Sequence, residues 1–93
     1  MAHLTQRLHE RGIDITPSQL VGLARECRQD TAVILTRCQI RLVADGNIGS
    51  NGDIIILIVR HQYPITIMFR RSNQPLTAQA LKVDAIIDRS ILQ

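Results

Sequence analysis

The sequence predicts an α+β fold, in which two N-terminal helices are followed by a small antiparallel sheet of three or four strands. Apolar residues recur at helical spacing in the first third of the chain, and at a period of two or in unbroken runs after that. This order of helices and then strands is typical of α+β domains. The chain has 93 residues, so we expect a single domain spanning residues 1–93.

The first helix is expected from Ala2 to Arg11. Leu4 and Leu8 form a short apolar stripe along it, so only one narrow side of the helix is expected to be buried. Gly12 follows directly, and glycine is the usual residue at the left-handed position where a helix ends.

The second helix is expected from Thr16 to about Arg28. Thr16 is a good N-cap, Pro17 suits the first helical position, and Gln19 completes a capping box. Four residues fall at the spacing of one buried face: Leu20, Leu23, Ala24 and Cys27.

A change to a period of two predicts a strand from Ala32 to Val43. One side of this strand is apolar and is expected to face the core, and the far half of the other side carries Arg37 and Arg41. Residues 31–38 also fit the extension of a helix, and this alternative stays open. Residues 44–53 hold three glycines, two asparagines and a serine, which predicts a loop.

Two further strands are expected to form a hairpin. Residues 54–59 are apolar without interruption, as in a strand that is covered on both faces. Residues 65–70 alternate again, and the residues between the two runs predict a loop of four or five residues. Thr77 is expected to cap a short helical turn through Leu81. Residues 83–87 fit either a helix or an edge strand, and both readings stay open.

Composition favours an anionic partner and a cytoplasmic location. The formal charge is +3, and ten of the eleven basic residues are arginine, which binds phosphates at two points. No apolar run approaches the roughly 20 residues that span a bilayer, and the start does not resemble a secretory signal. Cys27 and Cys38 lack metal-ligand spacing, so we expect reduced thiols, no metal and no cofactor.

The first helix carries the most informative side chains. His3, Arg7 and Arg11 recur every four residues, and each step drifts only about 40° around a helix, so the three form one stripe. Histidine transfers protons near neutral pH, and arginine neutralises a phosphate. A solvated helix face would give the same pattern, and this alternative stays open.

The opening pattern His-x3-Arg-x3-Arg-Gly-Ile, with the capped second helix and the sheet, resembles small RelE/BrnT-like toxin domains and their relatives in prokaryotes and phages. The later segment is also similar to the end of such domains, with Ser50-Asn51-Gly52-Asp53, an isoleucine-rich strand, Arg60 and residues 64–71. This resemblance implies a compact α+β fold and, for some members, metal-independent RNA cleavage. An antitoxin is then a candidate protein partner.

We therefore predict a toxin-like RNA-binding domain or metal-independent endoribonuclease. His3, Arg7 and Arg70 are the expected catalytic residues, because cleavage needs a group that moves protons and cations that neutralise the phosphate. Arg70 is expected at the end of the hairpin opposite to His61. The residues expected to contact RNA are Arg11, Arg37, Arg41, Arg60, His61 and Arg71.

The alternative is a non-catalytic protein-interaction module of phage or mobile-element origin. The small size, the apolar run 54–59 and the incomplete catalytic set favour it. Such a module would bind its partner through a sheet edge or the first helix. If the C-terminal segment is an edge strand, a second copy of the chain is a candidate partner in a homodimer.

Overall fold

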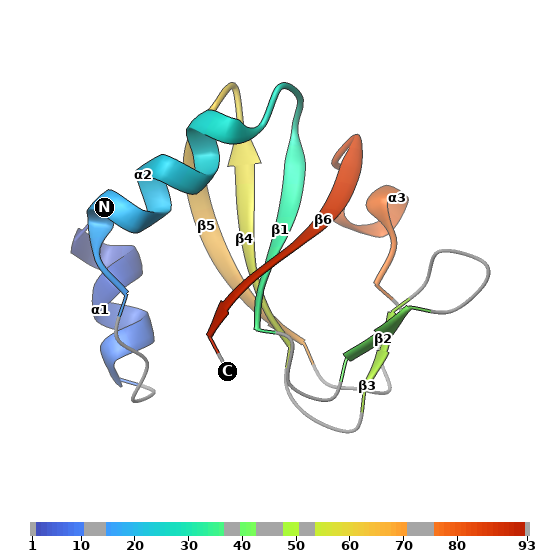
Figure 1. The fold of residues 1–93 in the computed structure, drawn as a ribbon, viewed down its shortest axis with the longest axis horizontal. Coiled ribbons are helices and arrows are strands. Elements are labelled where there is room, and N and C mark those ends of the chain that lie inside the picture. Colours follow the sequence, from blue (N-terminus) through green and yellow to red (C-terminus); the bar gives the residue numbers. More distant parts are fainter. Residues whose placement is uncertain are drawn as a thin grey trace.

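The computed structural model describes residues 2–10, 15–36, 40–42, 48–50, 54–70 and 76–92. Its layout is shown in Figure 1. The elements in chain order are α1 (Ala2–Glu10), α2 (Pro17–Glu26), β1 (Thr31–Thr36), β2 (Ile40–Leu42), β3 (Ile48–Ser50), β4 (Ile54–Arg60), β5 (Tyr63–Arg70), α3 (Ala78–Leu81) and β6 (Ala85–Leu92). None of the helices in these ranges is long and apolar enough to cross a membrane.

The main sheet has four strands in the order β5-β4-β1-β6 and is mixed. β4 runs antiparallel to both β1 and β5, whereas β6 runs parallel to β1. The α+β class is confirmed, but the expectation of a purely antiparallel sheet is wrong. The reason is that the chain returns through α3 to the end of the sheet where β1 starts before it enters β6 (Figure 1). The open question about residues 83–87 is resolved, since residues 85–92 form an edge strand.

The long strand expected from Ala32 to Val43 is divided between two sheets. β1 ends at Thr36, and β2 pairs with β3 in a separate two-stranded sheet. Residues 31–36 are strand and not helix. Residues 48–50 were expected to be part of a loop because the segment is rich in turn-forming residues, but they form β3, which pairs through its backbone with β2.

Both faces of the main sheet are buried, which corrects the expectation that β1 has one core face. Val33 and Leu35 are fully buried, because β1 is an interior strand. On one face, strand side chains such as Val33, Leu57 and Ile67 pack with Leu8 of α1 and Leu20 of α2. On the other face, strand side chains pack with Leu76 and the α3 residue Leu81, among them Ile34, Ile54, Ile56 and Ile58.

Local signals placed the helices correctly. Thr16 Oγ1 accepts a hydrogen bond from the Gln19 N–H at 3.2 Å, and the Thr16 N–H donates to Gln19 Oε1 at 2.9 Å, which confirms the capping box. Thr77 caps α3, since its Oγ1 accepts from the Ala80 N–H at 3.0 Å. α1 was expected to reach Arg11, but its described part ends at Glu10, and Arg11 and Gly12 lie outside the described residues.

The β4–β5 hairpin is confirmed, although its turn is shorter than expected. Arg60 pairs with Tyr63, so only His61 and Gln62 form the turn. Both have left-handed φ angles, 52° and 63°, as a type I′ hairpin turn requires. Val59 pairs with Pro64 and Ile58 with Thr66, so Ile65 is the additional residue of a β-bulge. Tyr63 and Pro64 fall between the two expected strands but belong to β5, an edge strand that tolerates proline at a bulge.

Candidate functional site

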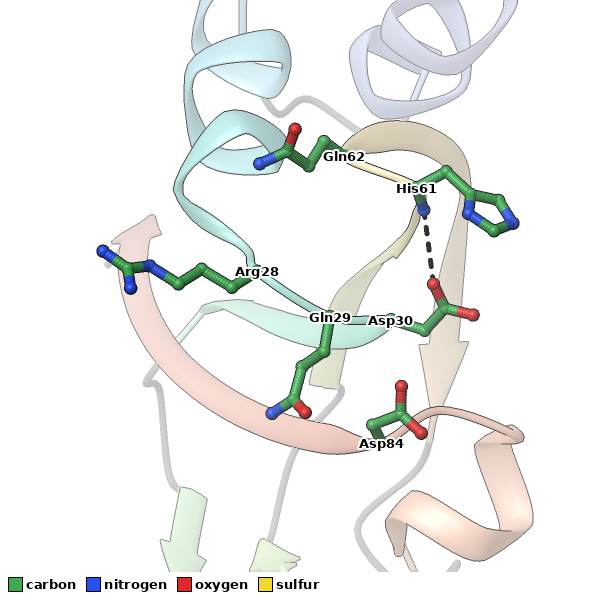
Figure 2. A pocket seen from close by; sticks show the side chains of 6 residues that line it. All are labelled: Arg28, Gln29, Asp30, His61, Gln62 and Asp84. Carbon is green, nitrogen blue, oxygen red and sulfur yellow. Dashed lines mark hydrogen bonds between the residues drawn. The ribbon is translucent and has the colours of Figure 1, made fainter.

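A pocket of about 400 Å³ lies at one end of the main sheet. It forms where α2 leads into β1, where β4 turns into β5, and where the chain enters β6 (Figure 2). We refer to it as the hairpin-tip pocket. Its lining residues are Arg28, Gln29, Asp30, His61, Gln62 and Asp84.

Asp30 holds the three segments of the hairpin-tip pocket together. Its Oδ1 accepts a hydrogen bond from the His61 N–H at 3.2 Å, and its Oδ2 accepts one from Arg60 Nη1 at 3.3 Å. The Asp84 N–H donates to the Asp30 carbonyl oxygen at 2.8 Å. Arg60 Nη1 also donates to the Lys82 carbonyl oxygen at 2.8 Å. These contacts fix the backbone positions from which the lining side chains extend.

Backbone geometry explains how each segment reaches the pocket. Cys27 is the extended C-cap of α2, so the chain leaves the helix direction before Arg28. His61 and Gln62 adopt left-handed conformations that cost free energy for residues other than glycine. Lys82 is a left-handed C-cap that turns the chain from α3 toward Asp84. Such strained residues often cluster at functional sites.

Four of the lining side chains are exposed and uncommitted. The guanidinium of Arg28, the amides of Gln29 and Gln62 and the carboxylate of Asp84 make no hydrogen bond or ion pair with the rest of the described chain. Figure 2 shows Gln62 and Arg28 on the side of the pocket across from Asp84, and the imidazole of His61 directed away from Arg28. The pocket thus presents the donors of Arg28 and Gln62 on one side, and the Gln29 amide and the Asp84 carboxylate on the other.

The three predicted catalytic residues are placed only in part. His3 and Arg7 lie in α1, but their side chains are outside the described part of the structure. Arg70 pairs with Ile54, and His61 lies in the turn, so these two residues lie at opposite ends of the hairpin as expected.

Alternation along β5 decides which face Arg70 occupies. Met68 packs on the α3 face of the sheet, and Ile67 packs on the face that α1 and α2 cover. Arg70 therefore lies on the face opposite to α1. Its Nε atom is buried and has no hydrogen-bond partner within the described ranges.

Two of the six residues predicted to contact RNA can be examined. Arg60 is half-buried and engaged with Asp30 and Lys82, so its role in the described structure is to join segments. His61 is exposed and lines the hairpin-tip pocket. Arg41 lies in β2, but its side chain is outside the described part of the structure. Arg11, Arg37 and Arg71 lie entirely outside it.

Sequence reasoning missed most of the hairpin-tip pocket. Arg28, Gln29, Asp30, Gln62 and Asp84 belong to no motif, and they lie in three segments far apart in the chain. Tyr63, which follows Gln62 and is 72% exposed at the start of β5, was not among the predicted site residues either. The only available signal was that each of the three segments lies at the end of a predicted element.

Cys27 is a core residue, as its helical position predicted. Its side chain is buried, and Sγ donates a weak hydrogen bond to the Leu23 carbonyl oxygen at 3.4 Å. Burial raises the pKa of the Cys27 thiol, and a hydrogen bond with Thr31 offsets this in part. Within the described residues, no group of three His, Cys, Asp or Glu side chains is arranged to hold a metal ion.

No family model, curated protein or solved structure was similar enough to this chain to be matched with it. The resemblance to RelE/BrnT-like toxin domains therefore stays a prediction from the sequence.

Proposed function

We propose that this chain is a small RNA-binding domain, and that single-stranded RNA lies across the hairpin-tip pocket and the start of β5. The observation that carries the proposal is the position of Tyr63. This exposed aromatic ring directly follows a pocket of uncommitted hydrogen-bonding side chains. Unpaired RNA bases are recognised by this combination of stacking on an aromatic ring and hydrogen bonds to their edges.

The charge of the chain supports the proposal. A net charge of +3 with ten arginines favours a phosphate backbone. Arg28 lines the pocket and is exposed, Arg25 is exposed in the last turn of α2, and Lys82 is exposed as the C-cap of α3. These cations can contact phosphates on either side of a base that occupies the pocket.

The test is fluorescence anisotropy with a labelled single-stranded RNA of about 12 nucleotides, measured at several salt concentrations. We expect affinity that falls with salt, since phosphate contacts release counterions. Tyr63→Ala should weaken binding about tenfold, the typical effect of losing one stacked base. Arg28→Ala should weaken it less and reduce the salt dependence.

Two control variants separate the proposed site from general surface effects. Ile65→Ala removes an exposed apolar side chain from the same strand, and Arg89→Ala removes an exposed charge on β6. Both should keep most of the affinity. Absence of binding at low salt, or equal losses in the controls, would contradict the proposal.

A more specific form of this proposal is that the chain also cleaves the bound RNA without a metal ion. The His3 and Arg7 pattern supports it, because both residues lie within α1 and recur at the spacing of one helix stripe. We expect a long unstructured RNA to be cleaved in the presence of chelator, and expect His3→Ala and Arg7→Ala to lose cleavage while remaining folded. Arg70→Ala should retain cleavage, because Arg70 lies on the face of the sheet opposite to α1. Intact RNA after prolonged exposure to high protein concentrations would leave binding without catalysis.

A protein-interaction module is the second candidate, and the position of β6 favours it. β6 is an edge strand, and its outer side has no neighbouring strand in the described structure. An added strand from an antitoxin or from a second copy would complete this edge. Light scattering of the purified chain and hydrogen exchange of β6 amides with and without a copurifying partner test this. Exchange at β6 that is equally fast in the complex would exclude pairing there.

A further inference from the structure

We infer that the hairpin-tip pocket selects guanine, with the Asp84 carboxylate accepting hydrogen bonds from the N1–H and N2–H groups of the base. This inference rests on the proposed RNA-binding function and assigns a base preference to that site. The free and the occupied hydrogen-bonding groups around the pocket determine which base edge fits.

The two carboxylates of the pocket have different roles. Both oxygens of Asp30 already accept hydrogen bonds, from the His61 N–H and from Arg60. The carboxylate of Asp84 is exposed and has no partner among the described residues. The Asp84 backbone is nevertheless anchored, since its N–H donates to the Asp30 carbonyl oxygen at 2.8 Å. Asp84 therefore presents a free acceptor pair from a fixed backbone position.

An acceptor pair of this kind discriminates among bases. Guanine presents two adjacent donors, N1–H and N2–H, that match the two oxygens of one carboxylate. Adenine and cytosine place a ring-nitrogen acceptor beside their amino group, and uracil has a single N–H between two carbonyl groups. Each of these bases would bring an acceptor lone pair against the carboxylate, which costs binding free energy.

The pocket also carries donors for the other edge of guanine. Guanine carries two acceptors, O6 and N7, which arginine and amide side chains commonly bind. Arg28 and Gln62 extend on the side of the pocket across from Asp84 (Figure 2). A volume of about 400 Å³ is large enough for one base. Tyr63 then remains available to stack with a neighbouring nucleotide.

The experiment compares three labelled eight-nucleotide RNAs: all uridine, uridine with one central guanosine, and uridine with one central adenosine. Each is titrated with the wild-type chain, with Asp84→Asn and with Glu10→Gln. Glu10 lies in α1 outside the pocket, and its change alters the net charge by the same amount as Asp84→Asn. Thermal unfolding of each variant verifies that it is folded.

We expect the wild-type chain to bind the guanosine RNA about tenfold more tightly than the other two, the discrimination typical of a two-point contact with a base. Asp84→Asn should abolish this ratio and leave binding of the uridine RNA unchanged or slightly stronger, whereas Glu10→Gln should keep the ratio. Equal affinity of the wild-type chain for all three RNAs, or a ratio that survives in Asp84→Asn, overturns the guanine inference and leaves the RNA-binding proposal standing. No binding to any of the three RNAs overturns the RNA-binding proposal itself.

Discussion

Arg60 Nη1 lies 3.3 Å from Asp30 Oδ2, and this ion pair joins the end of β4 to the residue before β1. Arg60 reaches the Lys82 carbonyl oxygen at the same time, so one guanidinium contacts two segments that line or flank the hairpin-tip pocket. The two side chains are about one-third exposed, at 34% and 30%. The pair therefore acts chiefly as a positional constraint and only modestly as a source of stability.

Asp30→Ala should lower the free energy of unfolding by about 1–2 kcal/mol, because it removes the ion pair and the acceptor of the His61 N–H. Urea unfolding of this variant, of Arg60→Ala and of the double variant gives the coupling between the two side chains. We expect a coupling of about 0.5–1 kcal/mol. Single effects that simply add would show that the pair contributes nothing beyond its separate contacts.

Gln62→Gly should raise the free energy of unfolding by about 1 kcal/mol, because it relieves a left-handed residue in the hairpin turn. The same change should weaken RNA binding, since it removes an amide from the pocket. Gln79→Gly is the matched control. Gln79 is exposed within α3, where glycine is expected to destabilise by about 0.5–1 kcal/mol. If the free energy of unfolding and the RNA affinity of Gln62→Gly both rise or both fall, this result would argue against a binding role for Gln62.

Ile67→Ala and Ile65→Ala make the same substitution two residues apart in β5. Ile67 is 2% exposed in the core under the N-terminal helices, and Ile65 is 51% exposed at the bulge. We expect Ile67→Ala to cost about 2–5 kcal/mol and Ile65→Ala to cost less than about 1 kcal/mol. Thermal or urea unfolding measures both. Similar losses would mean that the bulge places Ile65 in a packed environment.

The Cys27 thiol should make stability fall at alkaline pH. Burial raises its pKa in the folded chain, so folding favours the neutral thiol. This contribution is fully present below the ordinary thiol pKa and is lost as the pH rises through the raised value. Urea midpoints measured between about pH 7 and 10 should therefore fall more steeply for the wild type than for Cys27→Ala. Parallel pH profiles of the two proteins would contradict this expectation.

The parts of the fold that could be predicted are those whose signals are local. The capping box at Thr16 and the apolar run of β4 each specify their element within about ten residues, and both are present. The parallel β6 could not be predicted, because its direction depends on where α3 returns the chain and on a contact between Asp30 and Asp84. No pattern within one segment encodes such a contact.

The candidate site was predictable only at His61. Its other lining residues carry ordinary polar side chains, and they become a pocket only when three element ends meet. Most of the predicted site residues were arginines, and the side chains of two of them, Arg60 and Arg70, are described. Arg60 is engaged inside the protein with Asp30 and the Lys82 carbonyl oxygen. Side-chain type indicates which partner an arginine can bind, but the fold determines whether the guanidinium is free.

The pairing of β6 with β1 also has a kinetic consequence. The β4–β5 hairpin joins residues that are close in the chain, whereas the β1–β6 ladder starts with Thr31 beside Ala85. Closing so long a loop costs more entropy and lowers the folding rate, so we expect β6 to be recruited late. Asp84 precedes β6 directly, and the pocket therefore reaches its complete shape only in this late step. An edge strand of this kind is also among the first elements to open in the native ensemble, which would make guanine affinity sensitive to local unfolding of β6.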